Sequence, residues 1–593
     1  MRSPFTTVAQ AVAEAGTIGP DRGFVFQDND GKETHIKFPE VEQLTSHRAA
    51  ALQALGLKKG DRVGLVIIEP EDFVLTFLAA VRAGMVPVPM YPPMSFGKLD
   101  AYADRTGRIL ASSGAQVLVA SERLQNVLWG LVDKIPTLKR VVAAESLRTA
   151  KGTPTWPTVD PSDLCFLQYT SGSTADPKGV MVTHASLVAN CRGIINESLQ
   201  LRPDLGETAV SWLPLYHDMG LIGFVIAPIL YTIPTVLIPT LRFIKRPSVW
   251  LDTIHRHRGT VTFAPNFAFA LAAKRVRDED LDNWDLSCLH LVGCGAEPIN
   301  AATMREFTEL FSTRCKLPRN AVLPAYGMAE ATLAIGIKQR PDTFKTLLLN
   351  ADVFQHEGRA VAPTENCAVV EHVACGTAFS GHEIGVLGGD GEWLIDGMEG
   401  ELCLRGPSVT AGYFQNSEAT QDAFRSDGWL RTGDLGFVQH GQMYVTGRIK
   451  DLIIVNGRNV HPQAVEWVVA ELPGVRRGNV VAFSVPGEVS EEVVVVVETK
   501  GDTPSLVDDV KRAINQALSI SVSVVVCVPS GTLPKTSSGK LQRRKTRQMY
   551  LDGLFGVPGG PGPRTPGPAS ERITLARHVA ASMWARAKAA TLG

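Results

Sequence analysis

A loop rich in hydroxyl groups and glycine stands between two apolar segments of the chain: Tyr169-Thr-Ser-Gly-Ser-Thr-Ala-Asp-Pro-Lys-Gly179. The apolar segments, residues 163–168 and 180–183, are predicted strands. Hydroxyl and backbone N–H groups, together with Lys178, can wrap a polyphosphate, because glycine permits close approach of the backbone. The loop is not a Walker A loop, since Lys178-Gly179 reverses the Gly-Lys-[Ser/Thr] order and no helix is predicted directly after it. Alone, such a loop is more often a surface turn, so the rest of the chain must decide its meaning.

Strands alternate with helices on both sides of this loop. The predicted strands are residues 62–68, 116–120, 140–144, 261–264, 290–292 and 322–325, and the predicted helices are residues 72–83, 121–132 and a segment from His184. This alternation is typical of an α/β fold in which helices cover the sheets. After about Gly447 the predicted segments become shorter: strands at 452–455, 480–484, 493–498 and 522–528, and helices at 462–470 and 505–518. They indicate a compact α+β domain of about one hundred residues.

We therefore predict three parts: a large N-terminal domain over residues 1–447, a small C-terminal domain over 448–555, and a linker with a tail over 556–593. Residues 556–568, GVPGGPGPRTPGP, are too rich in proline and glycine to hold a core. Residues 571–590 have helical propensity, and we favour a frayed tail over a docking helix.

Composition and charge exclude several classes of protein. The chain has 593 residues, of which 45% are hydrophobic, so it is not disordered throughout. Its 59 Lys and Arg residues balance 60 Asp and Glu residues, which gives no overall attraction to nucleic acid. We expect no nucleic acid partner.

The cysteines and the apolar runs bear on location. Nine cysteines are scattered without any Cys-x-x-Cys spacing, which favours reduced thiols over disulfides or a zinc site. The N-terminal residues have no sustained apolar core like that of a secretory signal. The one membrane-length apolar run, residues 221–240, contains three prolines, and we expect a buried helix and strand there. The sequence thus predicts a cytoplasmic protein without a transmembrane segment.

Five further motifs follow the loop. They are Gly295-Ala-Glu-Pro298, Tyr326-Gly-Met-Ala-Glu330, Trp429-Leu-Arg-Thr-Gly-Asp434, Gly447-Arg-Ile-Lys-Asp451 and Pro534-Lys-Thr-Ser-Ser-Gly-Lys540. With the loop, they form an ordered series that resembles the adenylate-forming superfamily, from about residue 20 to about residue 550. This resemblance implies a large N-terminal domain followed by a small, mobile C-terminal domain.

Within that superfamily the chain most resembles the fatty acyl-AMP ligases. The segments that carry this resemblance are Leu213–Gly223, Ala264–Ala268, Tyr326–Leu333 and Asp451–Asn459 with Pro462-Gln463. Residues near 340–374 stand where those ligases carry an insertion that acyl-CoA ligases lack. Two features depart from the pattern: His461 stands where we expect tyrosine, and the tail beyond 556 has no counterpart.

The resemblance implies a reaction and its reactants. ATP and Mg²⁺ would activate a fatty acid to an acyl-adenylate with release of pyrophosphate, and the acyl group would pass to the phosphopantetheine thiol of an acyl carrier protein. Because a carboxylate must meet an α-phosphate, the site must neutralise converging negative charge and hold attacker and leaving group in line.

The resemblance also implies roles for residues at the matching motif positions. The β- and γ-phosphates would be held by Thr170, Ser171, Gly172, Ser173, Thr174 and Lys178. The rest of the nucleotide site would comprise Gly295, Ala296, Glu297, Tyr326, Gly327, Met328, Ala329, Asp434 and Arg448. Tyr326 would stack on adenine, and Asp434 would accept hydrogen bonds from the ribose hydroxyls. Glu330 and Thr174 would bind Mg²⁺.

Three further residues have expected roles in the chemistry and the domain motion. Lys540 would bridge the carboxylate and the α-phosphate from the small domain, and Lys450 would be the hinge. His217 and Asp218 resemble an acid/base couple, but a carboxylate that is already ionised needs no strong base, so we place His217 in the wall of the acyl or nucleotide pocket. His255 and His257 have no supporting ligand nearby, and we expect them on a helix surface.

Two alternatives stay open. An acyl-CoA ligase would share the first step and use free CoA as acceptor, and a ligase-like binding protein would have lost catalysis. The presence of Lys540, Glu330 and Asp434 argues against the second. The resemblance implies that the segment near 340–374 favours the carrier protein over CoA, since in those ligases the insertion packs on the large domain and hinders the small domain from swinging into the pose that transfers the acyl group to CoA. Its apolar residues, such as Phe344, Leu347 and Phe354, would let it bury an apolar face.

Overall fold

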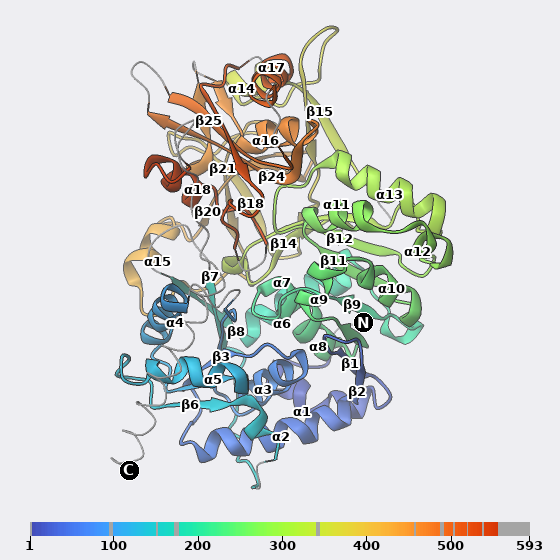
Figure 1. Ribbon diagram of the computed structural model, residues 1–593. Helices are drawn as coiled ribbons and strands as arrows, with labels where there is room; N and C mark the ends of the chain where they lie inside the picture. The colour runs from blue at the N-terminus through green and yellow to red at the C-terminus, as the bar shows by residue number, and fades with distance from the viewer. Residues whose placement is uncertain are drawn as a thin grey trace.

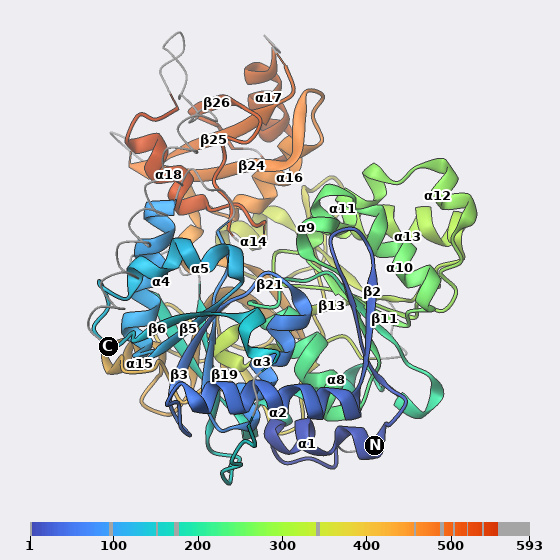
Figure 2. The same ribbon diagram turned by 60° about the horizontal axis from the view of Figure 1, so that its bottom comes forward.

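The computed structural model describes residues 3–93, 99–149, 152–170, 177–339, 344–455, 458–486, 491–501, 505–518, 520–536 and 539–555 (Figure 1). The expected α/β architecture is confirmed: a large N-terminal domain of sheets and helices carries a small C-terminal domain at one end (Figure 2). Residues 171–176 of the loop and the segment 556–593 lie outside the described residues.

A nine-stranded sheet forms the centre of the large domain, in the order β17-β14-β13-β12-β11-β9-β10-β1-β2. Its strands are β1 (Gly23–Gln27), β2 (Glu33–Lys37), β9 (Ala209–Ser211), β10 (Thr235–Leu237), β11 (Val261–Ala264), β12 (Leu291–Cys294), β13 (Val322–Gly327), β14 (Ala334–Ile337) and β17 (Thr377–Ala378). The strands from β13 to β1 are parallel, and antiparallel strands close both edges. Strands β11 and β12 are buried along their whole length, as expected of parallel strands covered on both faces.

A second, parallel sheet has the order β4-β3-β5-β6. It comprises β3 (Arg62–Val66), β4 (Val86–Pro89), β5 (Val117–Ala120) and β6 (Arg140–Ala143), and the separate hairpin of β7 (Leu164–Thr170) and β8 (Lys178–Thr183) flanks the loop. The helices of these two regions are α1 (Val8–Ile18), α2 (Phe38–Ala54), α3 (Pro70–Arg82), α4 (Leu99–Ser113), α5 (Glu122–Leu128), α6 (His184–Arg192), α7 (Asp218–Leu221), α8 (Ala227–Tyr231), α9 (Thr240–Lys245), α10 (Ser248–His257), α11 (Asn266–Arg275), α12 (Asp278–Asn283) and α13 (Ala301–Cys315).

An antiparallel sheet, β18-β19-β20-β21, completes the large domain. Its strands are β18 (Glu383–Leu387), β19 (Gly400–Arg405), β20 (Leu430–Gln439) and β21 (Gln442–Arg448), and helix α15 (Ser417–Ala423) precedes β20. The segment near 340–374 forms β15 (Thr346–Asn350), α14 (Ala351–Glu357) and β16 (Val369–Val373). Leu349 and Phe354 of this segment share a core cluster with Phe437 and Tyr444, so the segment packs on the antiparallel sheet.

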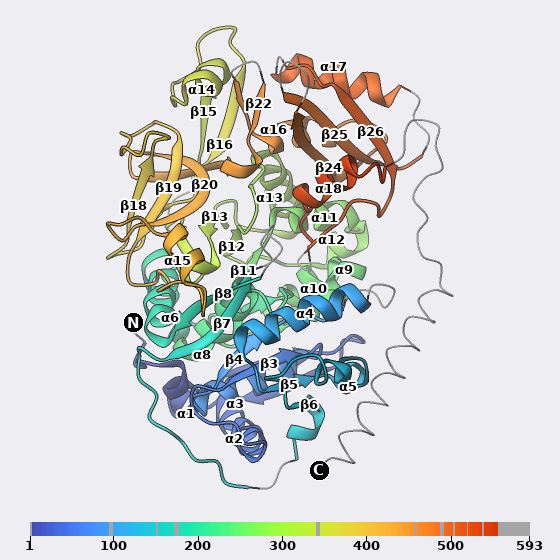
Figure 3. The same cartoon turned by 90° about the vertical axis from the view of Figure 1, so that its left-hand side faces the viewer.

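The small domain has its own cores. It contains β22 (Ile453–Val455), β23 (Arg458–Val460), β24 (Val475–Pro486), β25 (Glu491–Thr499) and β26 (Val524–Pro529), with α16 (Pro462–Ala470), α17 (Leu506–Leu518) and α18 (Arg543–Leu551). One cluster lies between the sheet and α16 and α17, and a second lies on the side of α18. Figure 3 shows α14 and β15 beside this domain, near β22. The boundary at 447/448 remains a prediction.

Most elements lie where the sequence predicts them, and β11 and α16 coincide with their predicted bounds. The predicted helix over 121–132 is wrong in its second half. Helix α5 ends at Leu128, and a tight turn around Gly130 follows, consistent with the low helix propensity of glycine. Residues 221–240 form buried helical turns and β10 as expected, and among the described residues no helix is long and apolar enough to cross a membrane.

Candidate active site

Lys540 of the small domain reaches the large domain beside two carboxylates. Its backbone is fixed by a tight turn, in which the Thr536 N–H donates to the Lys540 carbonyl over 2.7 Å. Burial lowers the pKa of Lys540, while the carboxylates of Glu297 and Asp218 act in the opposite direction. The net effect is a lowered pKa, and the two carboxylates offset part of the cost of burying the Lys540 charge.

Glu297 is held at the carboxyl end of β12. There the chain turns through Ala296, which has φ of +69°. A Cβ on Gly295 would lie only 2.8 Å from the Ala325 carbonyl oxygen, so this turn needs glycine. The Phe267 N–H donates to Glu297 Oε1 over 2.7 Å. Burial raises the pKa of Glu297 above its ordinary value. The Phe267 N–H and the charge of Lys540 offset part of that rise.

Tyr326, Asp434 and Arg448 form a second group. The Tyr326 hydroxyl donates to Asp434 Oδ2 over 2.7 Å, and Arg448 Nε donates to Oδ1 over 3.0 Å. Asp434 and Arg448 face each other in the register of β20 and β21, which explains their contact. Burial raises the pKa of Asp434, whereas Asp434 raises the pKa of Arg448. The carboxylate keeps lone pairs for further donors.

Glu330 lies in a third group with Tyr413. The Tyr413 hydroxyl donates to Glu330 Oε1 over 2.8 Å, and the Lys178 ammonium lies 4.9 Å from the centre of the Tyr413 ring. Burial raises the pKa of Glu330, and the hydrogen bond from Tyr413 lowers it. Thr170 and Lys178 are paired across β7 and β8 at the base of the loop. Ser171, Gly172, Ser173 and Thr174 lie outside the described residues.

His217 and Asp218 stand at the start of α7, near Lys540. Burial, with the charge of Lys540, lowers the pKa of His217 to about 3, so its imidazole is neutral near pH 7. Burial raises the pKa of Asp218. The charge of Asp218 in turn contributes to the raised pKa of Glu330. Asp218 thus links the lysine and the Glu330 group electrostatically.

The remaining expected site residues lie around these groups. Gly327 ends β13, and Met328 and Ala329 follow it directly, leading to Glu330. Lys450 is exposed in a short turn, Ile449–Asp451, between the last strand of the large domain and β22. Its role as hinge remains a prediction. His255 and His257 are structural: the Asp285 N–H donates to His255 Nδ1 over 3.0 Å, and His257 lies 2.9 Å from Glu33.

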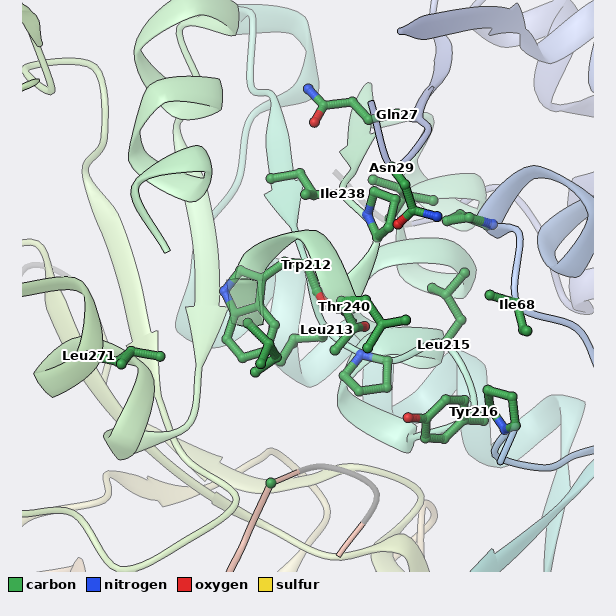
Figure 4. A pocket seen from close by; sticks show the side chains of 18 of the residues that line it. Gln27, Asn29, Ile68, Trp212, Leu213, Leu215, Tyr216, Ile238, Thr240 and Leu271 are labelled. Atoms are coloured by element: carbon green, nitrogen blue, oxygen red, sulfur yellow. Dashed lines mark hydrogen bonds between the residues drawn. The ribbon is translucent and has the colours of Figure 1, made fainter. Parts of the chain in front are cut away.

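A large cavity of about 1010 Å³ extends to the turn that precedes Lys540, where Thr536 and Gly539 line it. Figure 4 shows its apolar walls, which come from the segment after β9, from the end of β10 and from α11. Apolar or aromatic lining residues include Trp212, Leu213, Leu215, Tyr216, Ile238, Phe267 and Leu271. Gly539, next to Lys540, also lines this cavity, whereas His217 does not. An apolar molecule in this cavity can therefore reach the turn that carries Lys540.

Comparison with known proteins decides the family. Residues 13–414 match the family described as AMP-binding enzyme. The chain belongs to this family. It is 37% identical to a putative acyl-CoA synthetase of Caulobacter vibrioides, over 86% of this chain and 89% of that protein. It is 31% identical to the medium-chain-fatty-acid–[acyl-carrier-protein] ligase JamA of Moorena producens, over 90% of this chain and 93% of that protein.

Solved structures agree. A structure from a study of fatty acyl-adenylate ligases of E. coli and L. pneumophila superimposes with a TM-score of 0.88 and 32% identity, covering 94% of this chain and all of that one. The resemblance to fatty acyl-AMP ligases is therefore confirmed, and this AMP-binding enzyme is an acyl-adenylate-forming ligase.

Sequence reasoning missed two contributors to the site. Tyr413 lies outside the six motifs. Its only neighbouring sequence signal is the preceding Gly412, which does not indicate a role in the site. Phe267 contributes through its backbone N–H to Glu297, which no side-chain pattern reveals. Phe267 lies within the segment Ala264–Ala268 that carries the resemblance. The sequence therefore indicates the segment but not the hydrogen bond that its backbone donates.

Proposed function

We propose that this enzyme activates a fatty acid as its adenylate and passes the acyl group to the phosphopantetheine thiol of an acyl carrier protein. One observation carries the substrate: the largely apolar cavity of about 1010 Å³ is lined by Gly539, the residue directly before Lys540. A carboxylate at that end, with its chain in the cavity, meets a cation at its head and apolar walls along its tail.

Lys540 is proposed to act in the first step. A carboxylate oxygen attacks the α-phosphorus of ATP, and the bond to the β-phosphate bridging oxygen breaks as pyrophosphate leaves. Negative charge converges on the reacting atoms, and a partly buried ammonium stabilises it more than an exposed one does, because water screens it less. The neutral imidazole of His217 adds no like charge beside Lys540.

The other groups are proposed to hold the nucleotide. Asp434, with lone pairs remaining, accepts hydrogen bonds from the ribose hydroxyls, and Tyr326 borders the adenine. Lys178 neutralises charge on the β- and γ-phosphates, and the loop residues 171–174 hold the same phosphates by hydrogen bonds.

We propose that Glu330 holds Mg²⁺. Its side chain is partly buried, and the described residues contain no group of three acidic or metal-binding side chains that could form a cage. Mg²⁺ suits such a place, because it is commonly bound through one or two carboxylates together with phosphate oxygens and water. When bound, it would neutralise phosphate charge.

The segment near 340–374 supports the carrier protein as acceptor. Arg458 of the small domain lies 3.5 Å from Asp352 and donates to His356 over 3.3 Å, and both partners belong to α14. These contacts tie the small domain to the segment in the arrangement that brings Lys540 to Glu297. Movement into a second arrangement for acyl transfer must break them, and we propose that free CoA binds too weakly to drive that movement.

The acceptor is tested with a series of fatty acids, ATP, and either CoA or holo carrier protein. We expect pyrophosphate release and bound adenylate with either acceptor, but efficient thioester formation with the carrier alone. Rapid acyl-CoA formation would favour the alternative, an acyl-CoA ligase, which agrees with the name of the Caulobacter relative. A cytoplasmic location is also proposed, since the nine cysteines are all free thiols.

A further inference from the structure

Six basic side chains gather where the two domains meet at the mouth of the cavity. Two belong to α11 and four to the small domain, and all six line the cavity: Lys274, Arg275, Arg476, Arg477, Lys500 and Lys535. Acidic neighbours neutralise part of this charge. Arg476 pairs with the buried Glu498 at 2.8 Å. Arg477 pairs with Glu306 at 3.4 Å and also with Glu471. The mouth therefore keeps a net positive charge.

Lys274 and Lys500 form the least compensated part of this cluster. Among the described residues, neither forms a salt bridge with an acidic side chain. Partial burial lowers the pKa of Lys274, and the nearby charges of Lys500, Arg477 and Arg275 lower it further. Cations near the end of a helix are favoured by its dipole, which accounts for Lys274 and Arg275. It does not account for Lys500 and Arg477, which the other domain brings to the same place.

Helix α11 connects this cluster with the catalytic centre. Phe267, Leu271 and Lys274 are spaced at i, i+4 and i+7, so they form one stripe, and all three line the cavity. At one end of the stripe the Phe267 N–H binds Glu297, beside Lys540. Lys274 lies about 10 Å further along the helix, at the surface. The stripe is therefore apolar at its end near Glu297 and cationic at its end near the surface.

We propose that Lys274 and Lys500 form an anion-binding site that captures the carboxylate of the fatty acid while its tail enters the cavity. This inference rests on the proposed fatty acid substrate. The tail passes Leu271 and Phe267 first, and the carboxylate follows from the Lys274–Lys500 site past Lys535 to Lys540. Basic charge at the mouth of a cleft raises the local concentration of an anionic substrate and its association rate, and salt weakens the effect.

The test neutralises the site without changing its size. The double variant Lys274→Gln/Lys500→Gln removes both charges, and Lys316→Gln/Lys511→Gln is the matched control. Lys316 and Lys511 are exposed, one on each domain, and neither lines the cavity. The dissociation constants of dodecanoate and of dodecanol are measured on the full chain without ATP, at low and high salt. The kcat/KM for dodecanoate in adenylation and the rate of acyl transfer to holo carrier protein are measured in parallel.

We expect the double variant to bind dodecanoate about tenfold more weakly than the control at low salt, with a smaller difference at high salt. Binding of dodecanol is unchanged, because an alcohol carries no charge. The kcat/KM for dodecanoate falls with the binding, while the KM for ATP stays constant.

Three results would overturn the inference. Equal losses for acid and alcohol would mean that the variant damages the apolar cavity, and no loss would mean a solvated basic rim. A loss confined to acyl transfer would assign the site to the phosphodiester of the carrier's prosthetic group. If the wild-type protein binds dodecanoate in a charge-dependent way but adenylates no fatty acid, the proposed function fails and the anion site stands.

Discussion

The Nε2 atom of His461, in the small domain, lies 3.0 Å from Oε1 of Glu399, in the large domain. The two side chains are 9% and 5% exposed, and Thr446 also donates to the carboxylate. A Cβ on Gly447 would lie 2.6 Å from the imidazole, so the pair packs directly against the connection between the domains. Histidine, in place of the tyrosine that the resemblance leads one to expect, brings a ring nitrogen within hydrogen-bond distance of the carboxylate.

Breaking this pair should weaken the docked arrangement. Loss of a hydrogen bond to a charged group costs about 1.5–3 kcal/mol, and here it would leave the buried Glu399 carboxyl group without its imidazole partner. We expect His461→Ala to slow adenylation more than acyl transfer, because only the first step needs Lys540 beside Glu297. Both half-reactions are measured separately, with His461→Gln as the conservative variant. Equal slowing of both steps would argue against a role in docking.

The same pair predicts a dependence of stability on pH. His461 and Thr446 outweigh burial and hold the pKa of Glu399 below its ordinary value of 4.5. A depressed carboxyl pKa gives stability that is present above the unfolded-state value and is lost as the pH falls through the folded-state value. We therefore expect the unfolding midpoint of the wild type to exceed that of Glu399→Gln at pH 6, with a difference that shrinks below about pH 4.5. Denaturant titrations at both pH values check this.

Lys540→Ala should abolish acyl-adenylate formation while ATP binding is retained. The lysine acts on charge that develops during the reaction, and loss of such a contact costs about 3–4 kcal/mol, or roughly a hundredfold or more in rate. Pyrophosphate release and ATP affinity are measured together. The control is Lys511→Ala on the exposed face of α17. Wild-type adenylation by Lys540→Ala would remove this residue from the mechanism.

Tyr413→Phe isolates one hydrogen bond to Glu330. The phenyl ring preserves the contact with Lys178, whereas the hydroxyl that donates to the carboxyl is lost. Since hydrogen bonds to charged groups are worth about 1.5–3 kcal/mol, we expect the KM for Mg²⁺-ATP to rise by roughly tenfold or more. The fatty acid KM should stay constant. A variant with unchanged dependence on Mg²⁺ would place the metal elsewhere.

Removal of residues 557–593 should leave adenylation unchanged. The core of the small domain closes before this segment, since Phe555 and Tyr550 pack in the cluster beside α18. The rate of adenylation and the thermal unfolding of the truncated chain are compared with those of the full chain. A lower rate, or loss of cooperative unfolding, would show that the tail contributes to the body.

The elements that sequence predicts well are those whose signal is local. Strand β11 is continuously apolar between turn residues, and α16 begins at Pro462, so both have the expected bounds. The motifs indicate the catalytic groups because each motif is contiguous in sequence. By contrast, the Glu399–His461 pair and the Lys274–Lys500 site join residues far apart in the chain, and no periodic pattern connects them. Only the packing of the two domains brings these side chains together.

Lys540 belongs to a domain with cores of its own, whereas its carboxylate neighbours belong to the large body. Parts of a protein open with different free energies, and a smaller unit opens before a larger one when it buries less apolar surface. Heat should therefore act on this enzyme in two stages. The small domain is released first, which stops adenylation while the large domain still binds nucleotide, and the large domain unfolds at a higher temperature. The temperature at which activity is lost would then measure domain docking, not the melting of the main core.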